Sequence, residues 1–205
     1  KERASRYGYS IVLDITWWPG AEDVSTQMVG AKDANVDALL VFGDVADCVT
    51  LTRQMKANNW MPKYIQAWRG TWPSEFWDAA GENGQYVLSD GHWSHTYPYP
   101  GSAELGERFK AKFGKNSVSV GAFYALTQVL LQAIEQADDL TPAGIRQAVL
   151  SGEFDTIMGK IKYNPDGSAT YPSPAFQWID GEQITVWPKN LATGELQWAK
   201  PWKDR

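Results

Sequence analysis

The pattern of apolar and polar residues is clearest between residues 38 and 67, where it follows a strand, helix, strand order. Ala38–Phe42 is a short continuous apolar run, which is typical of a strand that is covered on both faces. From residue 48 onward, apolar or small side chains recur at the spacing of one helix face. These side chains are Cys48, Leu51, Thr52 and Met55. Residues 64–67 return to strand composition, so the pattern predicts a right-handed βαβ crossover in a parallel sheet.

The loops that follow these two strands are the first candidates for a binding site. In open parallel sheets, ligands bind beyond the carboxyl ends of the strands. The rule places Phe42–Asp44 and Ala67–Gly70 where a small molecule would lie.

The rest of the first ninety residues also alternates between strand and helix patterns. We expect the end of a helix at 1–7 with Gly8 as its stop, a strand at 9–14, a helix capped by Asp23, a short helix at 73–81 and a strand at 86–89. Because a domain rarely begins with the end of an amphipathic helix, the pattern indicates a piece of a longer protein.

The pattern changes after Gly91 and becomes mostly helical. Two segments rich in proline and aromatic residues, 92–101 and 170–174, suit stiff connections between lobes. Between them we expect helices at 102–113, at 119–138 and from the cap Thr141 to Gly152, then a strand at 159–163. For the second helix we predict a buried face made of Phe123, Leu126, Leu130, Ile134 and Ala137. A hairpin across Asp180–Gly181 and a surface tail complete the chain.

Composition excludes several classes of function. The net charge of −5 gives no basic surface for nucleic acid or an anionic membrane. No apolar run approaches the ~18 residues of a membrane span. The single cysteine, Cys48, lies on the predicted buried helix face and is interpreted as inert packing.

Candidate catalytic and metal-binding groups are few. His92 and His95 are the only histidines, and they lie in a proline-rich loop with Asp90 nearby but without an evident third metal ligand. The sequence shows no nucleophile motif and no phosphate-binding glycine loop. We therefore expect no enzyme activity, no metal and no cofactor.

The order of these segments resembles the second half of type I periplasmic substrate-binding proteins, the leucine/isoleucine/valine-binding family of ABC transporters. The resemblance rests on Pro19–Asp23, Asn35–Gly43, Leu51–Met55 with Asn59–Trp60, Phe123–Leu126 with Ala133–Glu135, Phe154–Gly159 with Ile161–Gly167, Phe176–Trp178 and Val186–Pro188. It covers about residues 6 to 202, and the pair Phe154–Gly159 and Ile161–Gly167 is its most specific part.

The resemblance implies an α/β fold of two parallel-sheet sandwich lobes joined by three crossings, with a ligand clamped between them. Residues 1–91, completed by 175–190, would form the second lobe, and residues 94–170 would form a partial, mostly helical first lobe, with 191–205 as a tail. The third crossing and the N-terminal sheet of the first lobe would precede Lys1, so the first lobe would be incomplete.

The resemblance also implies positions for the ligand site. Asp44 and Val45 match the loop where amino-acid binders place an aromatic residue, and Ser119 matches a cleft position at the start of the long helix. Arg69 stands where amino-acid binders place an acidic residue for the ligand ammonium. An arginine there favours a carboxylate or another anion, and the neighbouring Trp68 suits an aromatic or planar acid. The alternative is that Arg69 is an ordinary surface arginine whose guanidinium group is solvated by water.

We therefore expect the solute-binding component of an ABC importer, in the periplasm or outside the cell, which closes on its solute and is then recognised by a membrane permease. The solute would be an amino-acid-like molecule or an aromatic or anionic acid. A ligand-sensing regulatory domain of the same fold remains open as an alternative. So does a carbohydrate-binding module, because the chain has 11 tryptophans.

Overall fold

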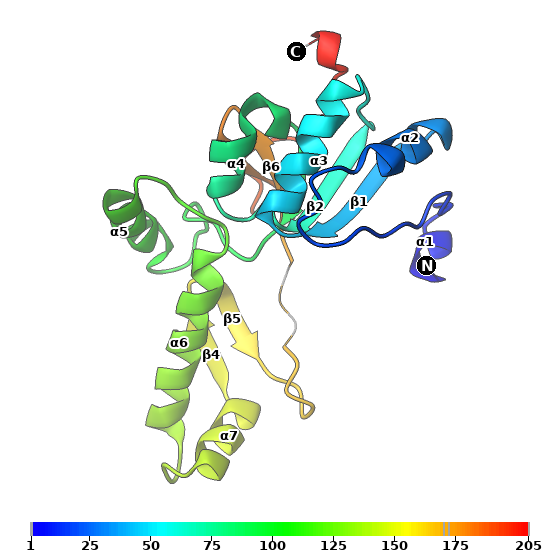
Figure 1. Cartoon of the computed structure of the whole chain (residues 1–205). Helices are drawn as coiled ribbons and strands as arrows, with labels where there is room; N and C mark the ends of the chain where they lie inside the picture. The colour runs from blue at the N-terminus through cyan, green and yellow to red at the C-terminus, as the bar shows by residue number, and fades with distance from the viewer. Residues whose placement is uncertain (1, 170, 172, 205) are drawn as a thin grey trace. The chain divides into compact units, whose positions relative to one another are not determined.

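The computed structural model describes residues 2–169, 171 and 173–204 (Figure 1). The chain divides into two compact units. Unit 1 consists of residues 1–89, 177–182 and 196–205, and unit 2 consists of residues 90–176 and 183–195. The fold is mixed α/β with a mostly parallel sheet in the order β1-β2-β3-β6-β7.

The predicted βαβ crossover is the centre of unit 1 and is confirmed. Strand β1 (Ala38–Gly43) runs parallel to β2 (Tyr64–Arg69), in a register that pairs Ala38 with Tyr64 and Gly43 with Arg69. Helix α3 (Val45–Ala57) connects them and covers one face of the sheet (Figure 1). The predicted helix face is buried: Cys48, Leu51, Thr52 and Met55 are each at most 2% exposed.

Unit 1 also contains the following elements, although β3 ends and β6 begins among residues of unit 2. They are α1 (Glu2–Arg6), α2 (Ser25–Asp33), α4 (Glu75–Ala80), the 3₁₀ turn η1 (Gly81–Gly84), β3 (Leu88–Asp90), β6 (Ala175–Ile179) and η2 (Trp202–Asp204). The core joins α2 and α3 to the strands through Met28, Met55, Ile65, Phe76 and Trp178. The hairpin from β6 to β7 (Glu182–Trp187) turns at Asp180 and Gly181, both with positive φ, as predicted.

The described residues of unit 2 form three helices and a small antiparallel hairpin. Helices α5 (Ser102–Phe113), α6 (Val120–Gln136) and α7 (Pro142–Ser151) are followed by β4 (Glu153–Thr156) and β5 (Gly159–Lys162). Thr141 caps α7 by accepting a hydrogen bond from the Gly144 amide at 3.1 Å, as predicted. Strand β4 was not expected from the sequence.

The buried face of α6 differs from the prediction. The buried residues are Gly121, Ala125, Val129 and Ala133, whereas Phe123 is 74% exposed and Leu126 is 60% exposed. These positions are buried because their small side chains allow neighbouring segments to pack closely against the helix. A Cβ atom on Gly121 would lie 2.0 Å from Cγ of Trp93. The large apolar side chains then face outward.

Two further expectations about unit 1 are wrong. Tyr9–Asp14 forms no strand, and its Ile11 and Val12 side chains are 50% and 59% exposed. In the described part of the chain β1 is the edge strand of the sheet, and residues 9–14 do not pair with its open side. Strand β1 is covered on one face only, because Leu40 is 64% exposed and Phe42 is 75% exposed.

Candidate functional site

The candidate site lies at the carboxyl ends of β1 and β2, where the two strands lead into loops. The strand register places Phe42 beside Trp68 and Gly43 beside Arg69. Asp44 follows Gly43 and precedes the first turn of α3. The parallel pairing therefore brings Asp44, Trp68 and Arg69 to one edge of unit 1.

Asp44 and Arg69 form an ion pair at this edge. The Nε atom of Arg69 lies 3.2 Å from Oδ1 of Asp44, and the two side chains are 61% and 65% exposed. An ion pair this open contributes little to stability, because water screens both charges. Both groups are accessible to solvent, so charged groups of a solute can pair with Arg69 and Asp44 in place of this ion pair.

The backbone at Arg69 is unusual and fixes the direction of this side chain. Its φ angle is +64°, in the left-handed region that residues with a Cβ rarely adopt. The Gly70 amide donates a hydrogen bond to the Trp68 carbonyl at 2.7 Å, which closes a tight three-residue turn around Arg69.

Gly70 makes this turn possible because the loop passes close to α3. A Cβ atom on Gly70 would lie 2.4 Å from the Asp44 carbonyl oxygen and 2.5 Å from Sγ of Cys48. Only glycine fits this contact without moving backbone atoms. The contact holds the loop after β2 against the loop after β1.

The side chain of Asp47 holds the backbone at Asp44 in place. Asp47 is 5% exposed, and its carboxylate accepts hydrogen bonds from the Asp44 amide at 3.0 Å and the Gly20 amide at 2.7 Å. This buried carboxylate joins the loop before α2 to the start of α3. The position of Asp44 is therefore set by backbone contacts as well as by Arg69.

An aromatic cluster borders the ion pair. The ring centroids of Phe42 and Trp68 are 5.7 Å apart, and those of Trp68 and Trp72 are 5.6 Å apart with the rings nearly perpendicular. Trp68 is 39% exposed, so it presents part of its ring to solvent. The arrangement offers an apolar surface next to one positive and one negative group.

Val45 and Ser119 are the other two residues predicted for the site. Val45 is the first residue of α3, and its side chain packs against the core of unit 1 rather than lying open at the edge. Ser119 belongs to unit 2, where it precedes α6 and its Oγ lies 2.8 Å from Oγ of Ser117. Phe42 lies within the loop Phe42–Asp44 that the sequence indicated, whereas Trp72 lies beyond the predicted range Ala67–Gly70 and was missed.

Other candidate groups do not form a reactive site. Burial, reinforced by the charges of Asp47 and Asp44, raises the pKa of the Cys48 thiol to about 12, so this sulfur is a protonated packing group. Within the described ranges, no group of three or more His, Cys, Asp or Glu side chains gathers as metal ligands would. Nor is any helix in that part of the chain long and apolar enough to cross a membrane.

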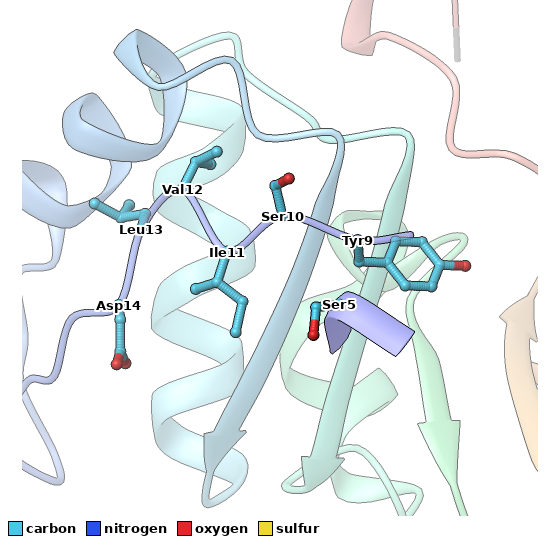
Figure 2. Close-up of a pocket in the computed structure, with 7 residues that line it drawn as sticks. All are labelled: Ser5, Tyr9, Ser10, Ile11, Val12, Leu13 and Asp14. Atoms are coloured by element: carbon cyan, nitrogen blue, oxygen red, sulfur yellow. The ribbon is translucent and has the colours of Figure 1, made fainter. Parts of the chain in front are cut away.

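A hollow in unit 1 is lined by residues other than those of this edge. It measures about 460 Å³ and is lined by Ser5 and Tyr9–Asp14, as Figure 2 shows. A smaller hollow of about 260 Å³ lies at the amino ends of β1 and β2, between Val36–Asp37 and Met61–Lys63. Neither hollow is lined by Asp44, Trp68 or Arg69, although the smaller one is lined by Lys63, Asp37 and Trp60.

Comparison with known proteins gives consistent matches. The family model described as "Periplasmic binding protein" matches residues 1–183. Leu/Ile/Val-binding protein homolog 7 of Brucella suis biovar 1 is 24% identical over 202 residues, which cover 93% of this chain and 51% of that protein. Homolog 8 of Brucella melitensis biotype 1 is 23% identical over 98% of this chain and 53% of its own length. The chain thus spans about half the length of the curated relatives it matches.

Solved structures show the same fold. A leucine-binding protein from Thermotoga maritima matches with a TM-score of 0.75 and 22% identity, over 83% of this chain and 49% of that one. A branched-chain amino acid transporter substrate-binding protein from Streptococcus pneumoniae, solved with isoleucine, matches with a TM-score of 0.71 and 17% identity, over 89% of this chain and 53% of that one. The α/β fold of a type I periplasmic binding protein is therefore confirmed, and the chain spans about half of each of these two structures.

Proposed function

The chain belongs to the periplasmic binding protein family, and from this membership we propose that it is part of the solute-binding component of an ABC importer. The named relatives are Leu/Ile/Val-binding protein homologues, and the solved neighbours are substrate-binding proteins rather than enzymes. The proposed partner is a membrane permease, and the proposed location is outside the cytoplasmic membrane. The relatives' names favour an amino acid as the solute.

The arrangement of charges at the edge of unit 1 supports an amino acid more specifically. Arg69 alone would disfavour a ligand ammonium, but Asp44 lies 3.2 Å from it and supplies the opposite charge. A zwitterion can place its carboxylate on Arg69 and its ammonium on Asp44, so both charges are matched. This pairing is the observation that carries the proposal.

The aromatic cluster suggests the rest of the solute. Phe42 and Trp68 are exposed next to the ion pair and would contact an apolar or aromatic side chain. We therefore favour an α-amino acid with a large apolar side chain over the purely anionic acid that Arg69 alone suggested.

The proposal also includes one residue of unit 2 and the division of the chain into two lobes. Ser119 is the proposed contribution of unit 2, and residues 1–91 with 175–190 and residues 94–170 are the proposed lobes. Because the chain spans about half of its relatives, we expect it to bind its solute weakly by itself, with a Kd near the millimolar range.

A matched set of probes tests the charge argument. Phenylalanine carries both charges, 3-phenylpropanoate lacks the ammonium and phenethylamine lacks the carboxylate. Calorimetric titration to millimolar concentrations should show that phenylalanine or leucine binds more tightly than either singly charged probe. If 3-phenylpropanoate binds as tightly as phenylalanine, the result would favour an anionic acid. Preferential binding of glucose would favour a carbohydrate-binding module. Either result would overturn the amino-acid proposal.

Matched variants locate the site. Arg69→Gln should weaken phenylalanine binding about fivefold, since both side chains are largely exposed and the lost interaction is screened. Lys63→Gln is the control, because Lys63 forms a similar exposed ion pair with Asp37, at 2.8 Å, at the opposite ends of the same strands. Equal effects of the two variants would show that the edge at Arg69 is not the site.

A further inference from the structure

The two proline- and aromatic-rich connections are fastened to each other inside unit 2. The first enters unit 2 at Asp90, and the second leaves it at Phe176. The Gly91 amide donates a hydrogen bond to the Pro174 carbonyl at 3.2 Å. Segments that are about eighty residues apart in the sequence are therefore neighbours.

A side-chain contact reinforces this backbone bond. Nδ1 of His92 is hydrogen-bonded to the Tyr171 hydroxyl, and the two ring centroids are 5.9 Å apart. The contact is partly buried, and His92 belongs to the first connection while Tyr171 belongs to the second. One polar pair thus bridges the two connections.

Gly91 allows the segments to approach this closely. A Cβ atom on Gly91 would lie 2.5 Å from Cε2 of Phe176 and 2.9 Å from Cγ2 of Val118. Any other residue would push the second connection away from the first.

The first connection is in turn anchored in the interior of unit 2. Trp93 is 1% exposed, and its Nε1 donates a hydrogen bond to Oγ of Ser102 at 3.2 Å. Ser102 donates to the Ile157 carbonyl at 2.9 Å, next to the turn between β4 and β5. The Trp93 amide also donates to the Val118 carbonyl at 3.2 Å. The connection is fixed to the start of α5 and to the segment before α6.

We propose that Gly91, His92, Tyr171, Pro174 and Phe176 form a clasp, which makes the two connections move as one body with unit 2. This inference rests on the proposed hinged function. It implies that the two connections cannot bend independently of each other.

Amide hydrogen exchange measures the clasp without any solute. Tyr171→Phe keeps the ring and removes the hydroxyl that bonds to His92. If the clasp is one cooperative unit, the Gly91 amide should exchange about three- to tenfold faster in this variant, the range expected for one lost hydrogen bond. The Val129 amide in the buried face of α6 should keep its wild-type rate.

Tyr124→Phe is the matched control, since Tyr124 lies on α6 and its side chain is 42% exposed. It should leave the Gly91 amide unchanged. An unchanged Gly91 rate in Tyr171→Phe would overturn the clasp. So would an equal acceleration at Gly91 and Val129, because that result describes a general loss of stability. A failed clasp would leave the solute-binding proposal standing, and a failure to bind solute would leave the exchange result intact.

Discussion

Replacing Gly70 by alanine tests the contact that builds the edge of unit 1. The new Cβ would lie 2.4 Å from the Asp44 carbonyl oxygen and 2.6 Å from its carbonyl carbon, and 2.5 Å from Sγ of Cys48. Contacts this short cannot be accommodated by rotating a side chain, because Asp44 contributes backbone atoms. The loop after β2 must move away from the start of α3.

The expected cost is that of overpacking a well-packed site, about 2 kcal/mol. For a chain of this size this corresponds to a fall in Tm of roughly 4–8 °C. The displaced loop should also separate Arg69 from Asp44 and weaken phenylalanine binding. Combining Gly70→Ala with Cys48→Ala should restore part of the stability, because it removes the sulfur contact and leaves the backbone contact.

Gly30→Ala provides the control for thermal unfolding followed by tryptophan fluorescence. Gly30 lies within α2, and nothing comes within 4 Å of a Cβ built there. The control should be stabilised by roughly 0.5–1 kcal/mol, because alanine favours the helix over glycine. If Gly70→Ala unfolds at the wild-type temperature, the close contact between the two loops is wrong.

Three further predictions concern single groups. Cys48 should react with a thiol reagent only on unfolding, because its pKa of about 12 keeps it protonated and its side chain is 1% exposed; rapid labelling of the folded chain would contradict this. Burial lowers the pKa of His92 below its usual value of 6.5, against the opposing charge of Asp90. The unfolded chain then binds the proton more readily, so the stabilising contribution is present above pH 6.5 and is lost as the pH falls through the folded-state pKa. His92→Gln should therefore flatten the decrease in stability below about pH 6.5 in urea titrations, and an unchanged slope would refute the assignment. Thr141→Ala should destabilise α7 by about 1 kcal/mol through loss of the cap to Gly144, whereas Thr141→Ser should retain most of it, as measured by amide exchange in that helix.

The sequence predicts the elements whose signals are local. Thr141 and Pro142 specify the start of α7, and Asp180 and Gly181 specify the turn between β6 and β7. The βαβ crossover follows from its periodicity alone. These features depend on residues that are neighbours in the chain.

The incorrect expectations concern which surfaces of the helices and strands pack against each other in the folded chain. Phe123 and Leu126 have the right spacing for a buried face of α6, but Gly121 decides the packing because it admits the Trp93 ring. Tyr9–Asp14 has strand composition, yet in the structure it does not pair with the open side of the edge strand β1. Apolar pattern alone cannot choose between two apolar faces.

The candidate site was predicted only in part, for the same reason. The sequence indicated Asp44 and Arg69 as separate positions in two loops. Their ion pair depends on the strand register, on the positive φ of Arg69 and on the absence of a side chain at Gly70. These are properties of the folded backbone, so the ion pair became visible only in the structure.

The most direct test of the account is an NMR titration that follows the Arg69 Nε–H and the Trp68 indole N–H while phenylalanine or leucine is added. The account predicts that both signals shift together and saturate with the same Kd, while signals from Ser5 and Tyr9–Asp14 stay in place. Saturating shifts at that other segment, with Arg69 and Trp68 unaffected, would contradict a solute site at the carboxyl ends of β1 and β2.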